Sequence, residues 1–213
     1  MKMDLLKYCL DYYGYDEPIL IEELRDNLFI KDSTLRMSLK RLVDNGKLNR
    51  YARGIYFIPK SNTLLKNQSM SINKVIRKKY LYDGKDSIGY QTGIALANKL
   101  NLTSQTAGVI EVVTNKESNR KRSTTINNWR IILRSPRTPI KQENIRVLQV
   151  LDVLNNFDKL SEKPLEDSLN SMKNYLADVD IDKRELNKIL ANYPKNTTSK
   201  VNESGLFDVL TQR

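Results

Sequence analysis

The side chains with the clearest chemical use in this sequence are the basic ones between residues 31 and 60, and their chemistry is the binding of a polyanion. That stretch holds eight basic and two acidic residues, whereas residues 1–30 hold three basic and seven acidic ones. Arginine and lysine donate hydrogen bonds to phosphates and to guanine O6 and N7. The charged face of a helix is most often only solvated, and small basic domains also bind proteins. The contrast in charge between residues 1–30 and 31–60 nevertheless favours DNA as the partner.

The spacing of apolar residues predicts the helix that would position these side chains. Leu35, Leu39, Leu42 and Val43 fall at i, i+4, i+7 and i+8, on one helical face, and Gly46 ends the helix. With that face in the core, a rotation of about 100° per residue turns the opposite side chains outward. The predicted major-groove contacts are Ser33, Thr34, Met37, Lys40 and Arg41, with Asp44 also outward and Arg36 on the flank.

A two-stranded hairpin is predicted directly after this helix. Residues 47–51 and 54–58 alternate around a tight turn, and Pro59 ends the second strand. Arg50 and Arg53 in this hairpin suit phosphates or a narrow minor groove.

Two further helices are predicted upstream, over residues 3–13 and from Pro18 onward. Three short helices followed by a basic hairpin indicate a winged helix-turn-helix. The sequence therefore predicts a DNA-binding domain over residues 1–60 and a linker at 61–68.

A second basic region follows the linker, because residues 62–142 hold 15 basic and four acidic residues. Its run of three cations at 77–79 has two interpretations, a solvated helix end or a phosphate contact, and the first is favoured. The predicted second basic surface, for nucleic acid or another function, consists of Arg77, Lys78, Arg120, Lys121, Arg122, Arg130, Arg134 and Arg137.

The elements expected to carry this surface are helices and a small antiparallel sheet. One helix should begin at Ser69 or Ser71 and another at Thr92 or Gly93. The dense β-branched residues at 109–113 predict a buried strand. Two strands, at 124–126 and 129–133, should pair back onto it, with Trp129 in the core.

The last part of the chain, 143–213, reads as helical. Three apolar stripes predict core-facing helices, the stretch 195–204 is expected to be mobile, and a short terminal helix should follow. The expected fold class is α+β, with the winged helix-turn-helix followed by a mixed α/β domain over 69–213. That domain would have a basic helix-sheet part at 69–142 and a helical part at 143–213.

Catalytic and metal-binding residue types are scarce. The chain has no histidine and one cysteine, so it lacks the residues of a Ser-His-Asp or Cys-His pair, an ordinary zinc site or an intramolecular disulfide. Cys9 is expected in the core. We expect no enzyme activity, cofactor or metal, although a nucleic-acid-processing enzyme that uses Glu111 with Asp83 or Asp86 is a further alternative. No apolar run approaches the roughly 18 residues of a membrane span, and we expect a cytoplasmic protein with no membrane partner.

One stretch resembles a known family. A winged helix is followed by Gly-Tyr-Gln-Thr-Gly at 89–93, by the run Gly-x-x-Ala-Leu-Ala-x-x-Leu-x-Leu-Thr-x-Gln at 93–105 and by a strand at 109–114. This arrangement resembles the AbiEi-type antitoxins of type IV toxin-antitoxin and phage abortive-infection systems. The resemblance covers about residues 1–160, and the run at 93–105 is its most specific part.

The resemblance implies two activities. The winged helix would repress its own promoter by binding inverted repeats, with residues 33–45 and 47–58 reading operator DNA. The region 89–137 would counter a co-encoded nucleotidyltransferase-like toxin without forming a stable complex. The tail after Leu160 corresponds less well to the family.

The sequence leaves two possibilities open for the oligomeric state and an alternative for the function. No sustained heptad pattern argues for a coiled-coil dimer, so paired half-sites would be filled by monomers or a weak dimer that cooperates on DNA. The alternative function is a stand-alone winged-helix transcriptional regulator whose second domain senses a ligand or dimerises.

Overall fold

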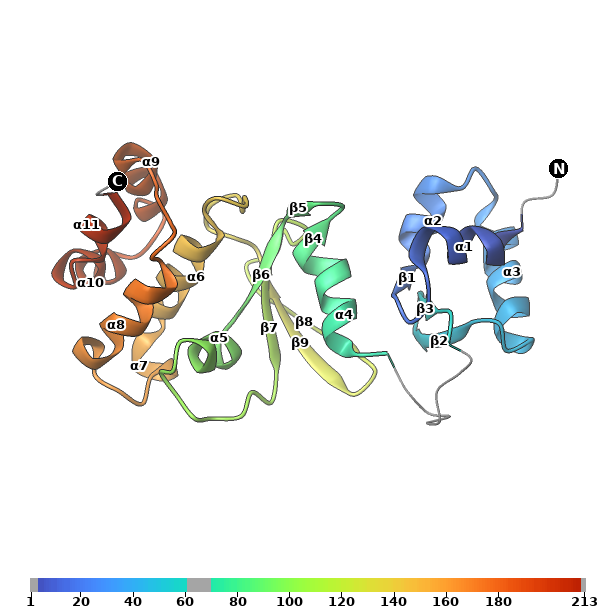
Figure 1. Ribbon diagram of the computed structural model, residues 1–213, viewed down its shortest axis with the longest axis horizontal. Helices are drawn as coiled ribbons and strands as arrows, with labels where there is room; N and C mark the ends of the chain where they lie inside the picture. Colours follow the sequence, from blue (N-terminus) through green and yellow to red (C-terminus); the bar gives the residue numbers. More distant parts are fainter. Residues whose placement is uncertain (1–3, 61–69, 212–213) are drawn as a thin grey trace. The chain divides into compact units, whose positions relative to one another are not determined.

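The computed structural model describes residues 4–60 and 70–211, and the chain divides into two compact units (Figure 1). The first unit is built from the described residues up to Lys79 together with Ile126–Asn128, and the second from Tyr80–Thr125 and the described residues after Asn128. Met3, Ser69 and the linker at 61–68 lie outside the described residues. The domain boundaries drawn from the sequence stay a prediction.

The first unit begins with three helices. They are α1 (Leu5–Tyr13), α2 (Ile21–Asn27) and α3 (Asp32–Asp44), and the short strand β1 (Ile19–Leu20) precedes α2. Asp4 caps α1 by accepting hydrogen bonds from the backbone of its first turn, which would otherwise have unpaired N–H groups. The second helix therefore begins three residues after Pro18, since Ile19 and Leu20 pair with a later strand instead.

The predicted helix and hairpin are both present. Leu35 and Leu39 are fully buried on α3, and Leu42 and Val43 are half-buried. The hairpin consists of β2 (Asn49–Ala52) and β3 (Ile55–Phe57), and its three-stranded sheet has the order β1-β3-β2. One hydrophobic core joins the helices to this hairpin, with Cys9, Leu24, Leu35, Leu39 and Leu48 among its members.

A short helical segment leads into the second unit. Helix α4 (Ile72–Ile76) is capped by Ser71, and a π-helical turn, η1 (Arg77–Leu81), continues it. Strands β4 (Tyr82–Asp83) and β5 (Asp86–Ser87) then form a small hairpin.

The main sheet of the second unit is mixed, which corrects the expectation of an antiparallel sheet. It consists of β6 (Gly89–Thr92), β7 (Ile110–Thr114), β8 (Arg122–Ile126) and β9 (Trp129–Arg134), in the order β6-β7-β9-β8. Strand β7 pairs antiparallel with β6 but parallel with β9. The second strand of the β8–β9 hairpin is the one that lies beside β7, and it runs in the same direction as β7. The segment at 89–92 is a strand that the sequence did not predict.

Trp129 is not a core residue, contrary to the prediction. Its side chain is 45% exposed. It is the first residue of β9, directly after the turn, whereas Ile131 and Leu133 further along that strand are fully buried. The buried positions of β9 are thus filled by smaller branched side chains.

The family-like run around residue 93 has a structural role. Gly93 has a φ of +68° and precedes α5 (Ile94–Lys99), and a Cβ there would lie 2.7 Å from Glu111 Oε1. A Cβ at Gly89 would lie 2.2 Å from the Tyr80 carbonyl oxygen. Both positions therefore require glycine. The run's apolar residues, Leu96, Ala97, Leu100 and Leu102, are buried in the core.

The C-terminal part is helical, as predicted. Its helices are α6 (Ile145–Asn155), α7 (Phe157–Leu160), α8 (Leu165–Tyr175), α9 (Lys183–Leu190), α10 (Lys195–Glu203) and α11 (Leu206–Thr211). The expectation of mobility at 195–204 is wrong, because this stretch forms α10. Thr197 and Val201 are buried on α10, so packing overrides the polar composition of the helix.

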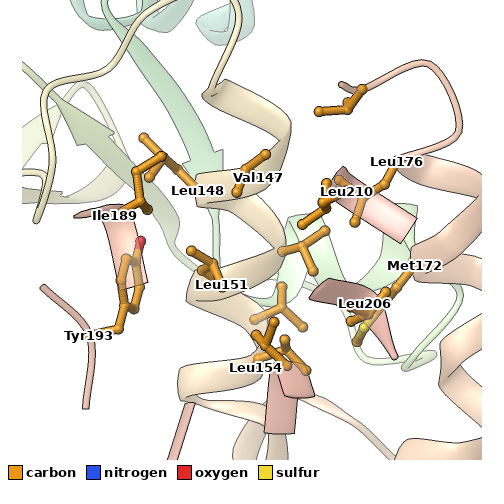
Figure 2. Packing of buried hydrophobic residues seen from close by; sticks show 14 of the residues in the cluster. Val147, Leu148, Leu151, Leu154, Met172, Leu176, Ile189, Tyr193, Leu206 and Leu210 are labelled. Atoms are coloured by element: carbon orange, nitrogen blue, oxygen red, sulfur yellow. The ribbon is translucent and has the colours of Figure 1, made fainter. Parts of the chain in front are cut away.

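The predicted apolar stripes meet in one core centred on α6. This helix contacts both β6 and α10, and it lies between the sheet and the later helices in Figure 1. Figure 2 shows how side chains from α6, α8, α9 and α11 pack together. The labelled members are Val147, Leu148, Leu151, Leu154, Met172, Leu176, Ile189, Tyr193, Leu206 and Leu210. The sheet and the helical tail thus form a single folded unit.

Candidate nucleic-acid interface

The outward face of α3 carries the side chains predicted to contact DNA. All eight residues of the predicted interface are exposed, six on α3 and two on the β2–β3 hairpin. They are Ser33, Thr34, Arg36, Met37, Lys40, Arg41, Arg50 and Arg53. Because Leu35 and Leu39 anchor the other face in the core, α3 presents its six residues of this interface on a fixed surface.

Arg36 differs from the other basic residues because it has a carboxylate partner. Asp32 accepts hydrogen bonds from Arg36 Nε (2.7 Å) and from Arg25 Nε (2.5 Å). The bond from Arg36, with that from Arg25, holds the pKa of Asp32 below its ordinary value. Arg36 is therefore committed to an ion pair at the start of α3.

The other cations of this interface have no carboxylate partner among the described residues. Arg41 Nη2 lies 3.4 Å from Met37 Sδ, and Arg50 Nε donates to the Ala52 carbonyl oxygen at 3.4 Å. Lys40 and Arg53 have no ion pair within residues 4–60 and 70–211. These four positive charges are available to an external anion.

Sequence reasoning missed three exposed residues beside α3. Phe29, in the turn before α3, is fully exposed, and Lys31 and Lys47 are exposed just outside the two ends of the helix. The basic composition of 31–60 could have identified the lysines. Phe29 lies outside any periodic pattern, so only the folded turn reveals its exposure.

The second set of predicted basic residues is only partly brought together. Arg120, Lys121, Arg134 and Arg137 line one cavity in the second unit. The other four are elsewhere: Lys78 Nζ lies 3.2 Å from Glu23 Oε2, Arg77 is exposed on η1, Arg130 Nε donates to Ser123 Oγ at 3.4 Å, and Arg122 binds Glu117.

The Arg122 pair stabilises the loop before β8. Glu117 is buried, and its carboxylate accepts hydrogen bonds from Asn119 N (3.0 Å) and Arg122 Nε (2.8 Å). Burial alone would raise the pKa of Glu117, but these bonds outweigh it and the pKa is lowered. Arg122 is thus a structural cation.

Two of the three carboxylates considered for metal chemistry, Glu111 and Asp83, are paired with cations. Glu111 is paired with Arg134, and Asp83 lies 3.4 Å from Lys116 Nζ. Within residues 4–60 and 70–211, no three His, Cys, Asp or Glu side chains form a possible metal site. Cys9 is fully buried, as predicted, and burial raises the pKa of its thiol to about 11, so it carries no thiolate at neutral pH.

Comparisons of the chain with protein-family models, with curated proteins and with solved structures gave no match. Among the described residues, no helix has the length and apolar character required to span a bilayer.

Proposed function

We propose that the first unit is a winged helix that binds double-stranded DNA. Helix α3 would enter the major groove, and the β2–β3 hairpin would contact the phosphate backbone or the minor groove. The observation that carries this proposal is the exposure of Lys40, Arg41 and Arg53, which have no carboxylate partner in the described part of the chain and lie on elements held by a shared core. Seven of the nine acidic residues of this unit precede α3 in the sequence, between Asp4 and Asp26, and α3 carries the other two, Asp32 and Asp44.

At the level of the whole chain, we propose an autorepressor and antitoxin. The resemblance of residues 1–160 to AbiEi-type antitoxins supports binding to inverted repeats in the chain's own promoter. It also supports action against a co-encoded nucleotidyltransferase-like toxin, without a stable complex. The cytoplasm would be the site of both activities.

A stand-alone regulator is the second candidate. The observation that favours it is the cavity of about 790 Å³ in the second unit, a size that suits a small-molecule ligand. The neighbouring reading frame separates the two candidates, since only the antitoxin requires a toxin gene beside its own.

The DNA proposal is tested by fluorescence anisotropy with a labelled fragment of the chain's own promoter. Lys40→Ala should weaken binding by about 1–3 kcal/mol if Lys40 contacts a base. Lys7→Ala is the matched control, because Lys7 is an exposed lysine on α1 and its substitution removes the same charge. Equal affinities for the two variants would contradict the placement of α3 in the groove.

The antitoxin proposal is tested by co-expression with the neighbouring nucleotidyltransferase-like protein. The full-length double variant Lys40→Ala, Arg41→Ala should lose repression of a promoter reporter and still rescue growth. Rescue lost together with repression would contradict the division between the two units. The same growth arrest with and without the wild-type chain would contradict antitoxin activity itself.

A further inference from the structure

We propose that the basic cavity of the second unit binds a small anion that carries a di- or triphosphate group. The cavity has a volume of about 790 Å³. Four cationic side chains line it, from the loop before β8 and from the end of β9 and the residues beyond. They are Arg120, Lys121, Arg134 and Arg137. This proposal concerns a different unit from the DNA interface and does not depend on it.

The positive charge of the cavity is not compensated from within. Asp152 is the one carboxylate among its lining residues, so the lining has a net charge of +3 when Asp152 is ionised. Arg134 is additionally paired with Glu111. Arg120, Lys121 and Arg137 have no ion pair with any described carboxylate, and Arg137 donates to the Asn192 carbonyl oxygen at 3.3 Å. An excess of partly enclosed positive charge favours a multiply charged anion.

Asp152 is held in place by two phenols. Tyr90 Oη donates to Asp152 Oδ2 at 2.8 Å, and Tyr193 Oη donates to Oδ1 at 3.4 Å. Burial raises the pKa of both phenols, so they remain protonated donors. Arg137 in turn stacks over the Tyr193 ring at 5.3 Å. This network fixes the position of Arg137 before any ligand binds, which lowers the entropy cost of binding.

Two lining residues, Arg134 and Asn155, have a side-chain N–H donor without an acceptor among the described residues. Arg134 Nε is buried and has no acceptor in the described part of the chain. Asn155 Oδ1 accepts a hydrogen bond from Thr197 Oγ1 at 3.1 Å, which leaves the amide nitrogen of Asn155 available. Guanidinium and amide N–H groups around one space match the several oxygens of a phosphate chain.

The volume of the cavity favours a ligand larger than a single phosphate. Cavities of about 300–1,000 Å³ hold molecules of nucleotide size. Nucleoside triphosphates and inorganic tripolyphosphate share the phosphate chemistry that the cavity would recognise, and direct binding experiments distinguish them.

The test is isothermal titration calorimetry on the full-length chain without DNA. The probes are ATP, GTP, inorganic tripolyphosphate, inorganic phosphate and a ten-nucleotide single-stranded RNA without a terminal phosphate. Similar affinities for ATP, GTP and tripolyphosphate would assign recognition to the phosphate chain. Tighter binding of a nucleotide would add a contact to the base or sugar, and either result supports the proposal.

Two variants link binding to the cavity. The double variant Arg120→Ala, Lys121→Ala should lower affinity about tenfold or more, because both side chains are exposed cations without ion pairs. Lys163→Ala, which removes an exposed lysine of the same unit outside the cavity, is the control and should bind like wild type. Arg137→Gln is a second variant that keeps a hydrogen-bond donor and removes the charge, and it should also weaken binding.

Several results would overturn the proposal. One is the absence of heat for every phosphate probe at about 1 mM. Another is equal affinity of wild type and the double variant, with Trp129 emission showing that both are folded. Binding of the RNA alone, lost in the double variant, would assign these cations to a nucleic-acid surface instead.

Discussion

The substitution Asp152→Asn should change how the stability of the second unit depends on pH. Asp152 is half-buried on α6, where the loss of solvent around its carboxyl is the largest influence and raises the pKa from 3.8 to about 6. Hydrogen bonds from Tyr90 and Tyr193 and the charges of Arg134 and Arg137 oppose this rise without cancelling it. The folded chain therefore holds this proton more tightly than the unfolded chain does.

The direction and size of the effect follow from this difference. Between pH 3.8 and about 6 the folded state binds more protons at Asp152, so the free energy of unfolding falls as the pH rises through that window. The stabilising contribution is complete below pH 3.8 and is lost above about pH 6. A shift of about two pKa units corresponds to roughly 3 kcal/mol. Asparagine cannot ionise and lacks this dependence.

The measurement is urea unfolding of wild type and variant between pH 3.5 and 8, followed by the fluorescence of Trp129, the single tryptophan. The difference in unfolding free energy should shift in favour of the variant by roughly 3 kcal/mol as the pH rises through this window. Asp208→Asn, which changes an exposed carboxylate on α11, is the matched control. A difference that stays constant with pH would show that Asp152 keeps an ordinary pKa and would refute its burial as the cause.

Four further substitutions test the fold and the interface. Gly93→Ala should destabilise the second unit by about 1–2 kcal/mol or more in urea unfolding, because a positive φ and the nearby Glu111 both oppose a side chain. Leu151→Ala should cost about 2–5 kcal/mol in the same assay, since Leu151 is fully buried. Arg53→Ala should flatten the dependence of log affinity for DNA on log salt by about 0.9, if Arg53 contacts one phosphate. Asp32→Ala should strengthen binding to the same promoter fragment, because it removes a negative charge and releases Arg36; weaker binding would show that the ion pair positions Arg36 for DNA.

Local patterns predicted much of the fold. The i, i+4, i+7, i+8 spacing of α3 placed Leu35 and Leu39 correctly in the core. The alternation and turn residues of the hairpin identified β2 and β3 in the same way. These features depend on neighbours within a few residues, so the sequence contains the necessary information.

Long-range pairing accounts for the errors. The parallel neighbour of β7 is determined by which strand of the β8–β9 hairpin reaches it, and this pairing joins residues about 20 positions apart in the sequence. Helix α10 has a polar sequence and depends on tertiary packing, which composition does not reveal. Trp129 is exposed because of its place at the start of a strand, although its residue type favours burial.

The DNA interface and the basic cavity differ in how far the sequence predicts them. The exposed face of α3 was predictable because a helical rotation assigns each residue to a side. The basic cavity was not, because Arg120, Arg134 and Asp152 come from three separate segments and only the fold brings them together. The carboxylate partners of Arg36, Arg122 and Lys78 are also invisible in the charge count.

The family-like stretch and the basic cavity are connected through two side chains, Tyr90 and Glu111. Gly89 and Gly93 allow β6 and the start of α5 to pack closely against Tyr80 and Glu111, as any Cβ at these positions would collide. Tyr90, between these glycines, then donates its hydroxyl to Asp152 in the cavity. Glu111 pairs with Arg134, a cation of the same cavity. The residues that carry the resemblance therefore also fix the charges of the cavity, which makes this part of the second unit the first place to test for the proposed antitoxin activity.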